Sequence, residues 1–522
     1  MMLTDLPYCF LFDETTSNQV KKQYEAYLPH WSNRHDKAQI NKQHMAEKKD
    51  RSSVECFEER RYLAPSEVLQ YQCNRMQPQV GTYFHVNTFN SSVAVQDDHV
   101  KKSLHDLSKL HFFLHARIDV DEEGNPYFCK IENDLNSDSD WINFRCLTLK
   151  ATSEWPAVVS EEFTTHLDFV HGPLWRAVWV TCPSNEFDQF VYMLIFICSH
   201  CIIDAMSATD LFANQFIPIL NQYITDQPSP SERPIKFPKS QEEIFNNHEA
   251  KKFDKYTTPW YLRCMLDAVL WFGDVTDRLN KSPDMKVVQE KQDFKSPYYF
   301  PFKIDPQASI KLQELCKTHS VSVHSVLTIL LTYAFKMLEK DYPLFRATCK
   351  KVIFPINMRK FNENLSTSPM PLGQYISSGA VKAQLIDPRN KAEFFQYAQK
   401  VTKQLKDKND INKQADIVSM LTYLLKKGRL MDVQMMFLSN AIHLSNIGNC
   451  NAFIRQNPDC KIQLTEQYFS VALNAYGVFV TTSTLNKQMF FCIGFAAGWL
   501  TDDFAEVLSR NFLACVEDLV AS

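Results

Sequence analysis

The chain has 522 residues, a length that suggests about two to four domains at roughly 100–200 residues each. Its 56 Lys and Arg residues nearly balance its 60 Asp and Glu residues, so it lacks the basic character of a nucleic-acid-binding domain. Only 11 glycines are present, and none falls in the clustered patterns whose backbone binds nucleotide phosphates. Composition therefore argues against nucleic-acid partners and against the common kinds of nucleotide-dependent chemistry.

The cysteines and the amino terminus indicate the compartment. The 15 cysteines are odd in number and irregularly spaced, and the amino terminus has no basic stretch of the kind that opens a secretory signal. We therefore read the cysteines as reduced thiols in a cytosol-like compartment. The longest apolar run, 190–198, is much shorter than the roughly 20 residues of a bilayer helix. We expect a cytoplasmic monomer without a transmembrane segment.

Residues 1–60 form a polar N-terminal extension without apolar periodicity, and residues 61–225 are expected to form an N-terminal lobe. Within this lobe we predict a helix with Val100, Leu104 and Leu107 on one face, and another from just after residue 200 to about residue 223. A hairpin is predicted across the Asp/Glu/Gly/Asn turn of 114–131. Strands are predicted at 83–89, 172–180 and 190–198, the last of them buried on both faces.

A linker and crossover region, 226–300, follows, because four prolines fall within residues 225–240. Residues 301–522 are then expected to form a C-terminal lobe, whose first helix begins at an Asp305-Pro306 cap. The predicted helices are 306–318, 323–338, 391–405, 416–426 and a final amphipathic helix with Phe504 and Leu519 on its apolar face. The predicted strands are 351–357, 443–447, 467–473, 477–485 and 489–495. This mixture predicts an α+β (mixed α/β) fold with two lobes.

The segment 192–212 is the most suggestive of catalysis. A buried strand ends just before His200, and Asp204 stands where the next helix should begin. An imidazole at that position can act as a general base near neutral pH, because its ordinary pKa is about 6.5. The same pattern also fits a core histidine beside an aspartate that only caps a helix. Cys198 and Cys201 make a C-x-x-C pair, but a structural zinc needs four ligands and the sequence has no second such pair.

This segment resembles the HHxxxDG motif of the acyl-CoA-dependent acyltransferase superfamily with the chloramphenicol-acetyltransferase-like fold. That superfamily includes alcohol acetyltransferases and the condensation domains of peptide synthetases. Further segments resemble the family in the family's order and extend the likeness over roughly residues 60 to 520: RRYLAPSE at 60–67, GPLWR at 172–176, VSVHSVLTILLTYAF at 321–335, the PINMR…PLGQYI region of 355–376, and LSNIG at 444–448.

The resemblance implies two lobes, each a mixed sheet with flanking helices, and a tunnel between them. It implies that His200 is the general base that deprotonates a small-molecule hydroxyl or amine for attack on a thioester. Acyl-CoA is the implied co-substrate, without an acyl-enzyme, a metal or a permanently bound cofactor. Alcohol-acetyltransferase-like or free-standing condensation-like proteins are the implied relatives.

Other roles are likewise implied by the family pattern. Asp204 would point away from the substrate and form a bidentate ion pair with Arg359, bracing the loop from the other lobe. Ser445 and Asn446 would lie near the tunnel and position the thioester or its oxyanion, although a plain strand-end turn fits them equally well. Ser207 keeps the family's serine position and is a further candidate for substrate binding.

Two positions depart from the motif: its first His is Ser199, and the glycine after its Asp is Ala205. Glycine adopts backbone angles that alanine resists, so the loop after His200 could be reshaped. Two alternatives therefore stay open. The protein could be a catalytically inactive binder that keeps the tunnel, or a condensation-type protein that takes its acyl group from a carrier-protein thioester.

Overall fold

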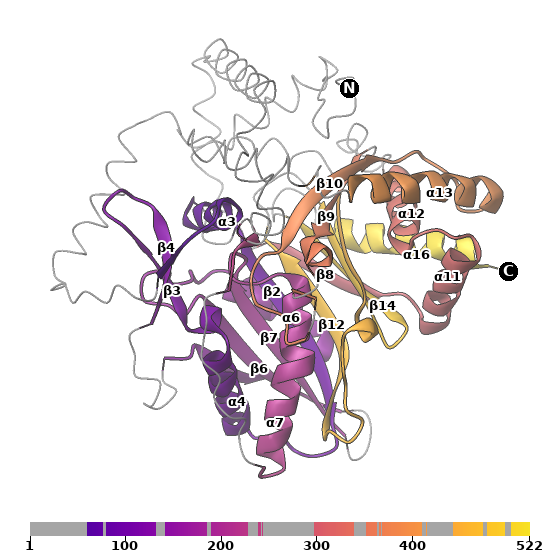
Figure 1. Ribbon diagram of the computed structural model, residues 1–522. Helices are drawn as coiled ribbons and strands as arrows, with labels where there is room; N and C mark the ends of the chain where they lie inside the picture. Colours follow the sequence, from indigo (N-terminus) through magenta and orange to yellow (C-terminus); the bar gives the residue numbers. More distant parts are fainter. Residues whose placement is uncertain are drawn as a thin grey trace, which may run out of the picture.

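The computed structural model describes residues 60–76, 80–131, 141–184, 189–227, 238–241, 243, 297–338, 351–362, 365–366, 368–409, 414, 442–472, 478–495 and 503–521. These residues form two lobes, each built on a mixed sheet, with a small third sheet beside the first lobe (Figure 1). The predicted α+β class is therefore confirmed. All of the extension 1–60 except Arg60, most of the region 226–300 and the helix predicted at 416–426 lie outside the described residues.

The N-terminal lobe is built on a five-stranded sheet in the order β12-β2-β7-β6-β5. Its strands are β2 (Thr82–Ser91), β5 (Phe144–Thr148), β6 (Trp175–Cys182), β7 (Phe190–Ser199) and β12 (Ile462–Val471). Residues 193–198 of β7 are at most 1% exposed, as expected for an apolar strand at the centre of a sheet. Only the β5–β6 pair is parallel.

Strand β12 corrects one of the expected boundaries. The sequence assigned its residues to the C-terminal lobe, 301–522, but the strand pairs antiparallel with β2 and completes the N-terminal sheet. Figure 1 shows it, in yellow, running beside the indigo β2. The C-terminal half of the chain therefore contributes one strand to the other lobe, and this exchange ties the two lobes together.

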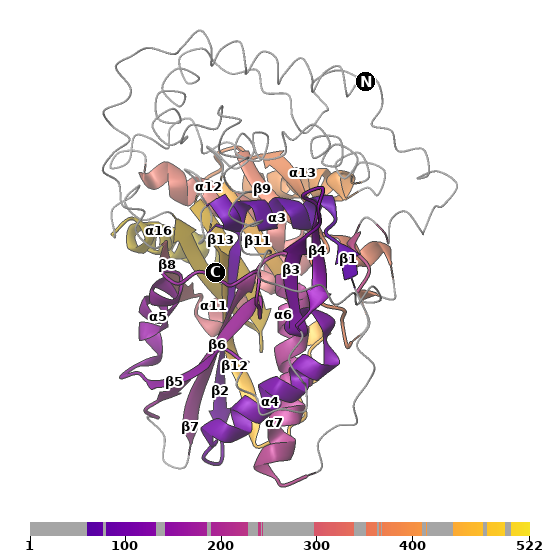
Figure 2. The same cartoon turned by 90° about the vertical axis from the view of Figure 1, so that its left-hand side faces the viewer.

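Helices cover both sides of this sheet. One side packs on a continuous helical stretch made of α6 (Ala205–Asp210), a π-helical turn η4 (Leu211–Phe216) and α7 (Ile217–Ile224), with α4 (Asp97–Leu110) beside α7 (Figure 2). The other side packs on α5 (Trp155–Glu162) and the first strand of the second lobe. Helix α3 (Pro65–Met76) lies near the small sheet of β1 (Arg60–Tyr62), β4 (Pro126–Lys130) and β3 (Ala116–Val120), which contains the predicted hairpin (Figure 1).

The C-terminal lobe is built on a six-stranded sheet in the order β10-β9-β11-β13-β14-β8. Its strands are β8 (Tyr298–Lys303), β9 (Lys351–Asn357), β10 (Ile376–Lys382), β11 (Ile442–Asn449), β13 (Val478–Leu485) and β14 (Gln488–Phe495). Helices α11 (Pro306–Thr318), α12 (Val323–Leu338), α13 (Lys391–Lys408) and α16 (Asp503–Val520) pack against it. Asp305 caps α11 as predicted, since its carboxylate accepts the N–H groups of Gln307 and Ala308.

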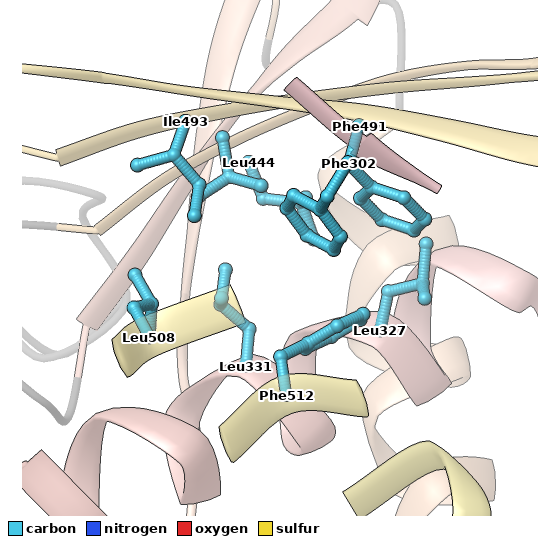
Figure 3. A pocket seen from close by; sticks show the side chains of 9 residues that line it. Phe302, Leu327, Leu331, Leu444, Phe491, Ile493, Leu508 and Phe512 are labelled. Atoms are coloured by element: carbon cyan, nitrogen blue, oxygen red, sulfur yellow. The ribbon is translucent and has the colours of Figure 1, made fainter. Parts of the chain in front are cut away.

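An apolar gap lies inside the C-terminal lobe, between the sheet and helices α12 and α16. It has no space large enough for a water molecule. Figure 3 shows its lining, which is entirely apolar: Phe302, Leu327, Leu331, Leu444, Val480, Phe491, Ile493, Leu508 and Phe512. It is therefore a packing gap of this lobe's core, and the tunnel expected between the lobes stays a prediction.

Among the described residues no single helix is long and apolar enough to cross a membrane; α11 and α12 pass such a test only together, and a bend of 116° separates them.

Candidate active site

His200 lies at the point where β7 ends and the chain turns towards α6. Its backbone N–H donates to the carbonyl of Gly81, 2.9 Å away, and its side chain is 9% exposed. Its Nδ1 lies 2.7 Å from the carbonyl oxygen of Ile203. Because a carbonyl can only accept a hydrogen bond, Nδ1 carries the proton in the neutral ring. The lone pair of a neutral His200 is therefore on Nε2.

Burial lowers the pKa of His200 below its ordinary value of 6.5, since a charged imidazolium is poorly stabilised away from water. The bond to Ile203 and the negative charge of Asp204 act in the opposite direction without reversing the shift. The ring is therefore neutral at pH 7, which is the form that a general base requires.

Asp204 caps helix α6 and contacts the other lobe at the same time. Its Oδ1 accepts the backbone N–H and the hydroxyl of Ser207, both at 3.0 Å. Its Oδ2 accepts Nη1 of Arg359 at 2.5 Å and the backbone N–H of Tyr375 at 2.9 Å. The capping role and the contact expected between Asp204 and Arg359 are thus both present, although only one guanidinium nitrogen is used and the pair is not bidentate.

The electrostatics of this pair favour the charged carboxylate. Burial by itself would raise the pKa of Asp204, but the charge and hydrogen bond of Arg359 and the N–H groups of Ser207 and Tyr375 outweigh it, and the pKa falls below 3.8. Arg359 is 1% exposed, and its guanidinium carbon lies 4.5 Å from the ring centroid of Tyr375. The carboxylate is therefore a fixed negative charge at the lobe junction, stabilised by groups from the other lobe.

Arg359 reaches this position because the chain turns sharply after β9. Residues Met358–Phe361 form a single 3₁₀ turn, capped by Asn357, whose Oδ1 accepts the N–H of Arg359. The segment 370–375 lies against the same helix, α6. The backbone N–H of Met370 donates to Asp210, and that of Tyr375 donates to Asp204, the residue that caps α6. The region of 355–376 is therefore held against the helix that follows His200.

Ser207, a candidate for substrate binding, is occupied elsewhere. It is fully buried, its hydroxyl donates to Asp204, and it accepts the N–H of Asp204 in return, which makes a capping box. Its hydrogen bonds are used inside the protein, and its contact with substrate stays a prediction. The sequence could have indicated the capping box, because Asp-x-x-Ser at a helix start is itself a capping pattern.

Ser445 and Asn446 lie where β11 passes from one core to the other. Leu444 belongs to the core of the C-terminal lobe, while Ile447 packs against that of the N-terminal lobe. Ser445 is buried opposite Thr481, and Asn446 is half-buried with its side-chain oxygen accepting the N–H of Gly448. Within the part of the chain that the structure describes, no hydrogen bond joins either residue to His200. Their proposed contact with a thioester stays a prediction.

The two departures from the motif are accommodated. Ser199 is buried and donates from its hydroxyl to Asn74, 2.8 Å away, so it belongs to the lobe interior. Ala205 is the first residue of α6 and is not among the described residues with positive φ. An alanine therefore fits this helix start without the strain that would require glycine.

The thiols near the motif behave as small buried side chains. Burial raises the pKa of Cys198 well above its ordinary value and that of Cys201 to about 12. Since the thiolate is the form that binds metals and attacks electrophiles, these thiols are unreactive at neutral pH. The described residues contain no group of three His, Cys, Asp or Glu side chains that could hold a metal ion.

The structure adds two residues that the sequence did not single out. Gly81, with φ +78°, supplies the carbonyl that holds the backbone of His200. Tyr83 stacks on the imidazole, with ring centroids 5.2 Å apart and planes inclined by 26°. The only sequence signal was that polar residues recur on a strand that is otherwise strongly apolar.

Comparison with known proteins relies on structure alone. No protein-family model matches this sequence, and no curated protein is similar to it. Among solved structures, the trichothecene 15-O-acetyltransferase from Fusarium sporotrichioides is similar over 90% of this chain and 97% of its own, with a TM-score of 0.62 and 9% identity. The first condensation domain of the CDA synthetase matches over 90% and 97%, with a TM-score of 0.58 and 12% identity.

Polyketide synthase associated protein 5 from Mycobacterium tuberculosis is a third similar structure, covering 88% of this chain and 97% of its own at a TM-score of 0.52 and 12% identity. Such low identities show the fold and nothing finer. With its two sheets, the exchanged strand and these neighbours, the chain has the two-lobed chloramphenicol-acetyltransferase-like fold that the sequence resemblance implied.

Proposed function

We propose that the protein is an acyltransferase, and that it moves an acyl group from acyl-CoA to the hydroxyl or amine of a small molecule with His200 as the general base. The observation that carries the proposal is the state of His200 itself. Its Nδ1–H is held by Ile203, its ring is neutral, and the lone pair of Nε2 is not used in any described hydrogen bond of the protein.

In the proposed step, Nε2 takes the proton of the acceptor while the acceptor oxygen or nitrogen forms a bond to the thioester carbonyl carbon. The tetrahedral intermediate then collapses, the carbon–sulfur bond breaks, and the proton passes from Nε2 to the departing thiolate. His200 returns to its starting state and no acyl-enzyme forms. A positioned base of this kind contributes about 10²–10⁴-fold to the rate.

Asp204 and Arg359 support the proposal as positioning residues. Asp204 makes no hydrogen bond to the His200 ring; it caps the helix that begins at the next residue, Ala205, and joins that helix to Arg359 and Tyr375. The loop 200–204 is thereby held at both ends, at one by Gly81 and at the other by the ion pair. Such a loop presents the imidazole in one geometry, which is what orientation-dependent catalysis needs.

The test is a transfer assay with a panel of acyl-CoA donors and hydroxyl and amine acceptors, comparing the parent protein with His200→Ala. We expect the variant to lose about 10²–10⁴-fold in kcat. Because the ring is buried and stacked, it should also lose some stability. His115→Ala is the matched control, since His115 is a buried histidine of the same lobe that likewise bonds a backbone carbonyl. It should lose stability without a comparable loss of kcat, and a fully active His200→Ala protein would refute the mechanism.

A condensation-type reaction is the second candidate, and the similarity to a condensation domain favours it. It uses the same base but takes its acyl group from a carrier-protein thioester. Offering the same acyl group on coenzyme A and on a carrier protein separates the two. If neither donor reacts but a small molecule binds, the inactive-binder alternative is supported instead.

A cytoplasmic location and a monomeric state are also proposed, from the cysteine usage and the sequence.

A further inference from the structure

Strand β2 carries a row of polar side chains on a buried face. Tyr83, His85 and Asn87 alternate along the strand, each at most 2% exposed, while Phe84 and Val86 on the opposite face follow the usual apolar pattern. No well-formed hydrogen bond satisfies the Asn87 amide group or Nε2 of His85, although the amides of Asn87 and Gln467 lie near enough to the His85 ring to act on its pKa. Polar groups buried in this way cost stability. Because they lie on β2, which pairs with the strand that ends before His200, we ask whether they serve the site.

These side chains form a continuous column that ends at His200. The ring of Tyr83 stacks on the His200 imidazole, and its hydroxyl lies 2.7 Å from Nδ1 of His85. The His85 ring in turn stacks on Phe469, with ring centroids 6.0 Å apart and an interplanar angle of 13°, and it also contacts Phe212. Phe469 belongs to the exchanged strand β12 and Phe212 to the π-helical turn, so the His85 ring is packed by two other elements.

Both members of the Tyr83–His85 pair are neutral. Burial raises the pKa of Tyr83 well above 10 and lowers that of His85 to about 3. The phenol therefore keeps its proton and is a natural donor to Nδ1 of a neutral His85. The phenolic oxygen lies on the Cβ–Cγ axis, but its O–H prefers the plane of the ring. Donation to Nδ1 of a fixed His85 therefore favours one rotation of the Tyr83 ring about this axis, and hence one plane towards His200.

The hydrogen bond to Ile203 fixes only one edge of the His200 ring. A ring held at Nδ1 can still tilt about that contact, and a tilt moves Nε2, which lies on the far side of the ring. A flat aromatic face at stacking distance prevents the tilt because the two rings would collide. Tyr83 thus supplies the restraint that Ile203 cannot.

We propose that Tyr83 and His85 are positioning residues for the general base: Tyr83 sets the plane of the His200 ring, and His85 acts through the Tyr83 hydroxyl. This inference rests on the proposed function, in which Nε2 of His200 takes the proton of the acceptor. Neither residue is proposed to contact substrate. Besides Tyr83, the titratable group whose charge acts on His200 among the described residues is Asp204, and Cys201 is the next residue of the chain.

The kinetic test uses variants that remove parts of the column. Tyr83→Phe keeps the ring and removes the hydroxyl, and we expect kcat to fall about 3- to 10-fold with KM unchanged. Tyr83→Leu removes the flat face, and kcat should fall about 10²-fold, as misplacement of a catalytic group does. His85→Phe should act like Tyr83→Phe, and adding it to Tyr83→Phe should cost nothing further, because both remove the same contact.

A second test needs no substrate. Nuclear magnetic resonance of the full chain labelled at histidine side chains reports the tautomer and the titration midpoint of His200, assigned by the signal lost in His200→Gln. In the parent protein we expect the proton on Nδ1. Tyr83→Ala opens space for water beside the ring, so the midpoint should rise towards the ordinary value of about 6.5 and both tautomers should appear. Tyr83→Leu should also mix the tautomers, and it serves if the alanine variant does not fold.

Tyr299 provides the matched control. It is another buried tyrosine, on the opposite side of the N-terminal sheet against Phe84, and its hydroxyl has no described partner. Tyr299→Leu should cost stability yet leave kcat and the His200 signals unchanged. Unchanged kcat and unchanged His200 signals in folded Tyr83→Leu would overturn the inference. If the parent protein transfers no acyl group while the signals still shift in the Tyr83 variants, the proposed function fails and the positioning of the His200 ring stands.

Discussion

Gly81 controls the position of His200 through its backbone. It adopts φ +78°, its carbonyl accepts the His200 N–H, and a Cβ placed on it would lie 3.1 Å from Oε1 and 3.2 Å from the carbonyl oxygen of Gln70. We expect Gly81→Ala to lower the free energy of unfolding by about 1–3 kcal/mol and to lower kcat as the loop shifts. Gly124→Ala is the control, because Gly124 also has a positive φ but an added Cβ would meet nothing within 4 Å. Equal kcat in both variants would contradict the link between Gly81 and His200.

The ion pair between Asp204 and Arg359 can be separated from helix capping. Asparagine caps helices as well as aspartate does, so Asp204→Asn keeps the cap and removes only the charge. We expect this change and Arg359→Met each to cost about 3–5 kcal/mol in chemical unfolding, since each leaves a buried charge without its partner. The double variant should cost less than the sum of the two. Because only Nη1 makes the contact, Arg359→Lys should be less damaging than Arg359→Met.

Additive losses in that cycle would show that the two residues are not energetically coupled.

The sequence, through its family resemblance, indicated this pair and the place of His200 because motif and loop are local features. It did not single out Gly81 or Tyr83, since their roles depend on which strand pairs with β7, and the polar residues that recur on β2 were the only signal. It also could not separate the capping box of Ser207 from a substrate contact, because a hydroxyl within reach of substrate and one that closes a capping box look the same in a sequence.

The helical stretch 205–224 is the element that joins the lobes. Asp210 is fully buried and accepts hydrogen bonds from Asn214, Gln215 and the backbone N–H of Met370 in the other lobe. Because residues 211–216 form a π-helical turn, the side chains of Asn214 and Gln215, four and five residues after Asp210, both reach its carboxylate. Asn214 then continues the contact, donating to the carbonyl of Phe453 and accepting the N–H of Arg455.

Asp210→Ala should therefore loosen the lobe junction. It leaves three donors without an acceptor, so we expect a loss of about 2–4 kcal/mol in the free energy of unfolding. Native-state hydrogen exchange should show faster exchange of the Met370 amide. Asp98→Ala is the control, because Asp98 makes an exposed ion pair with Lys102 and should cost no more than about 1 kcal/mol. Unchanged protection of Met370 would refute the role of Asp210.

Most elements were predictable from periodicity because they are long and strongly patterned. Helix α11 has the predicted bounds, and β2, β7, β9 and β13 lie where alternation or continuous apolar character placed them. Short strands such as β5 and β10 were missed, since five to seven residues of mixed polarity do not stand out from a loop. The exchange of β12 could not be predicted, because the pattern of a strand does not say which sheet it joins.

At the scale of the whole molecule, two apolar cores are joined by a junction made largely of polar groups. The N-terminal core contains the residues of β2, β6, β7 and β12, and the C-terminal core those of α12, α16 and the larger sheet. Between them lie the buried carboxylates of Asp204 and Asp210, which accept hydrogen bonds from residues of the C-terminal lobe, whereas the column beside His200 belongs to the N-terminal core. Contacts at such a junction are directional, so they fix how the lobes sit, whereas the two cores supply the bulk of the hydrophobic stabilisation.

The buried histidines and Asp204 should make the protein sensitive to acid. His85 has a pKa of about 3 in the folded protein and about 6.5 when unfolded, so between these values the unfolded chain binds more protons. Stability should therefore rise with pH through this window and be lost as the pH falls below about 6.5. The depressed pKa of His200 acts in the same direction, and that of Asp204 adds to the loss of stability below about pH 4.

From pH 7 to pH 5 we expect His85 alone to lower the free energy of unfolding by about 2 kcal/mol. Guanidinium unfolding across this range measures the slope, and His85→Phe should make it shallower while Tyr299→Phe leaves it as in the parent. Equal slopes in the parent protein and in His85→Phe would show that His85 is not the neutral, buried group described above.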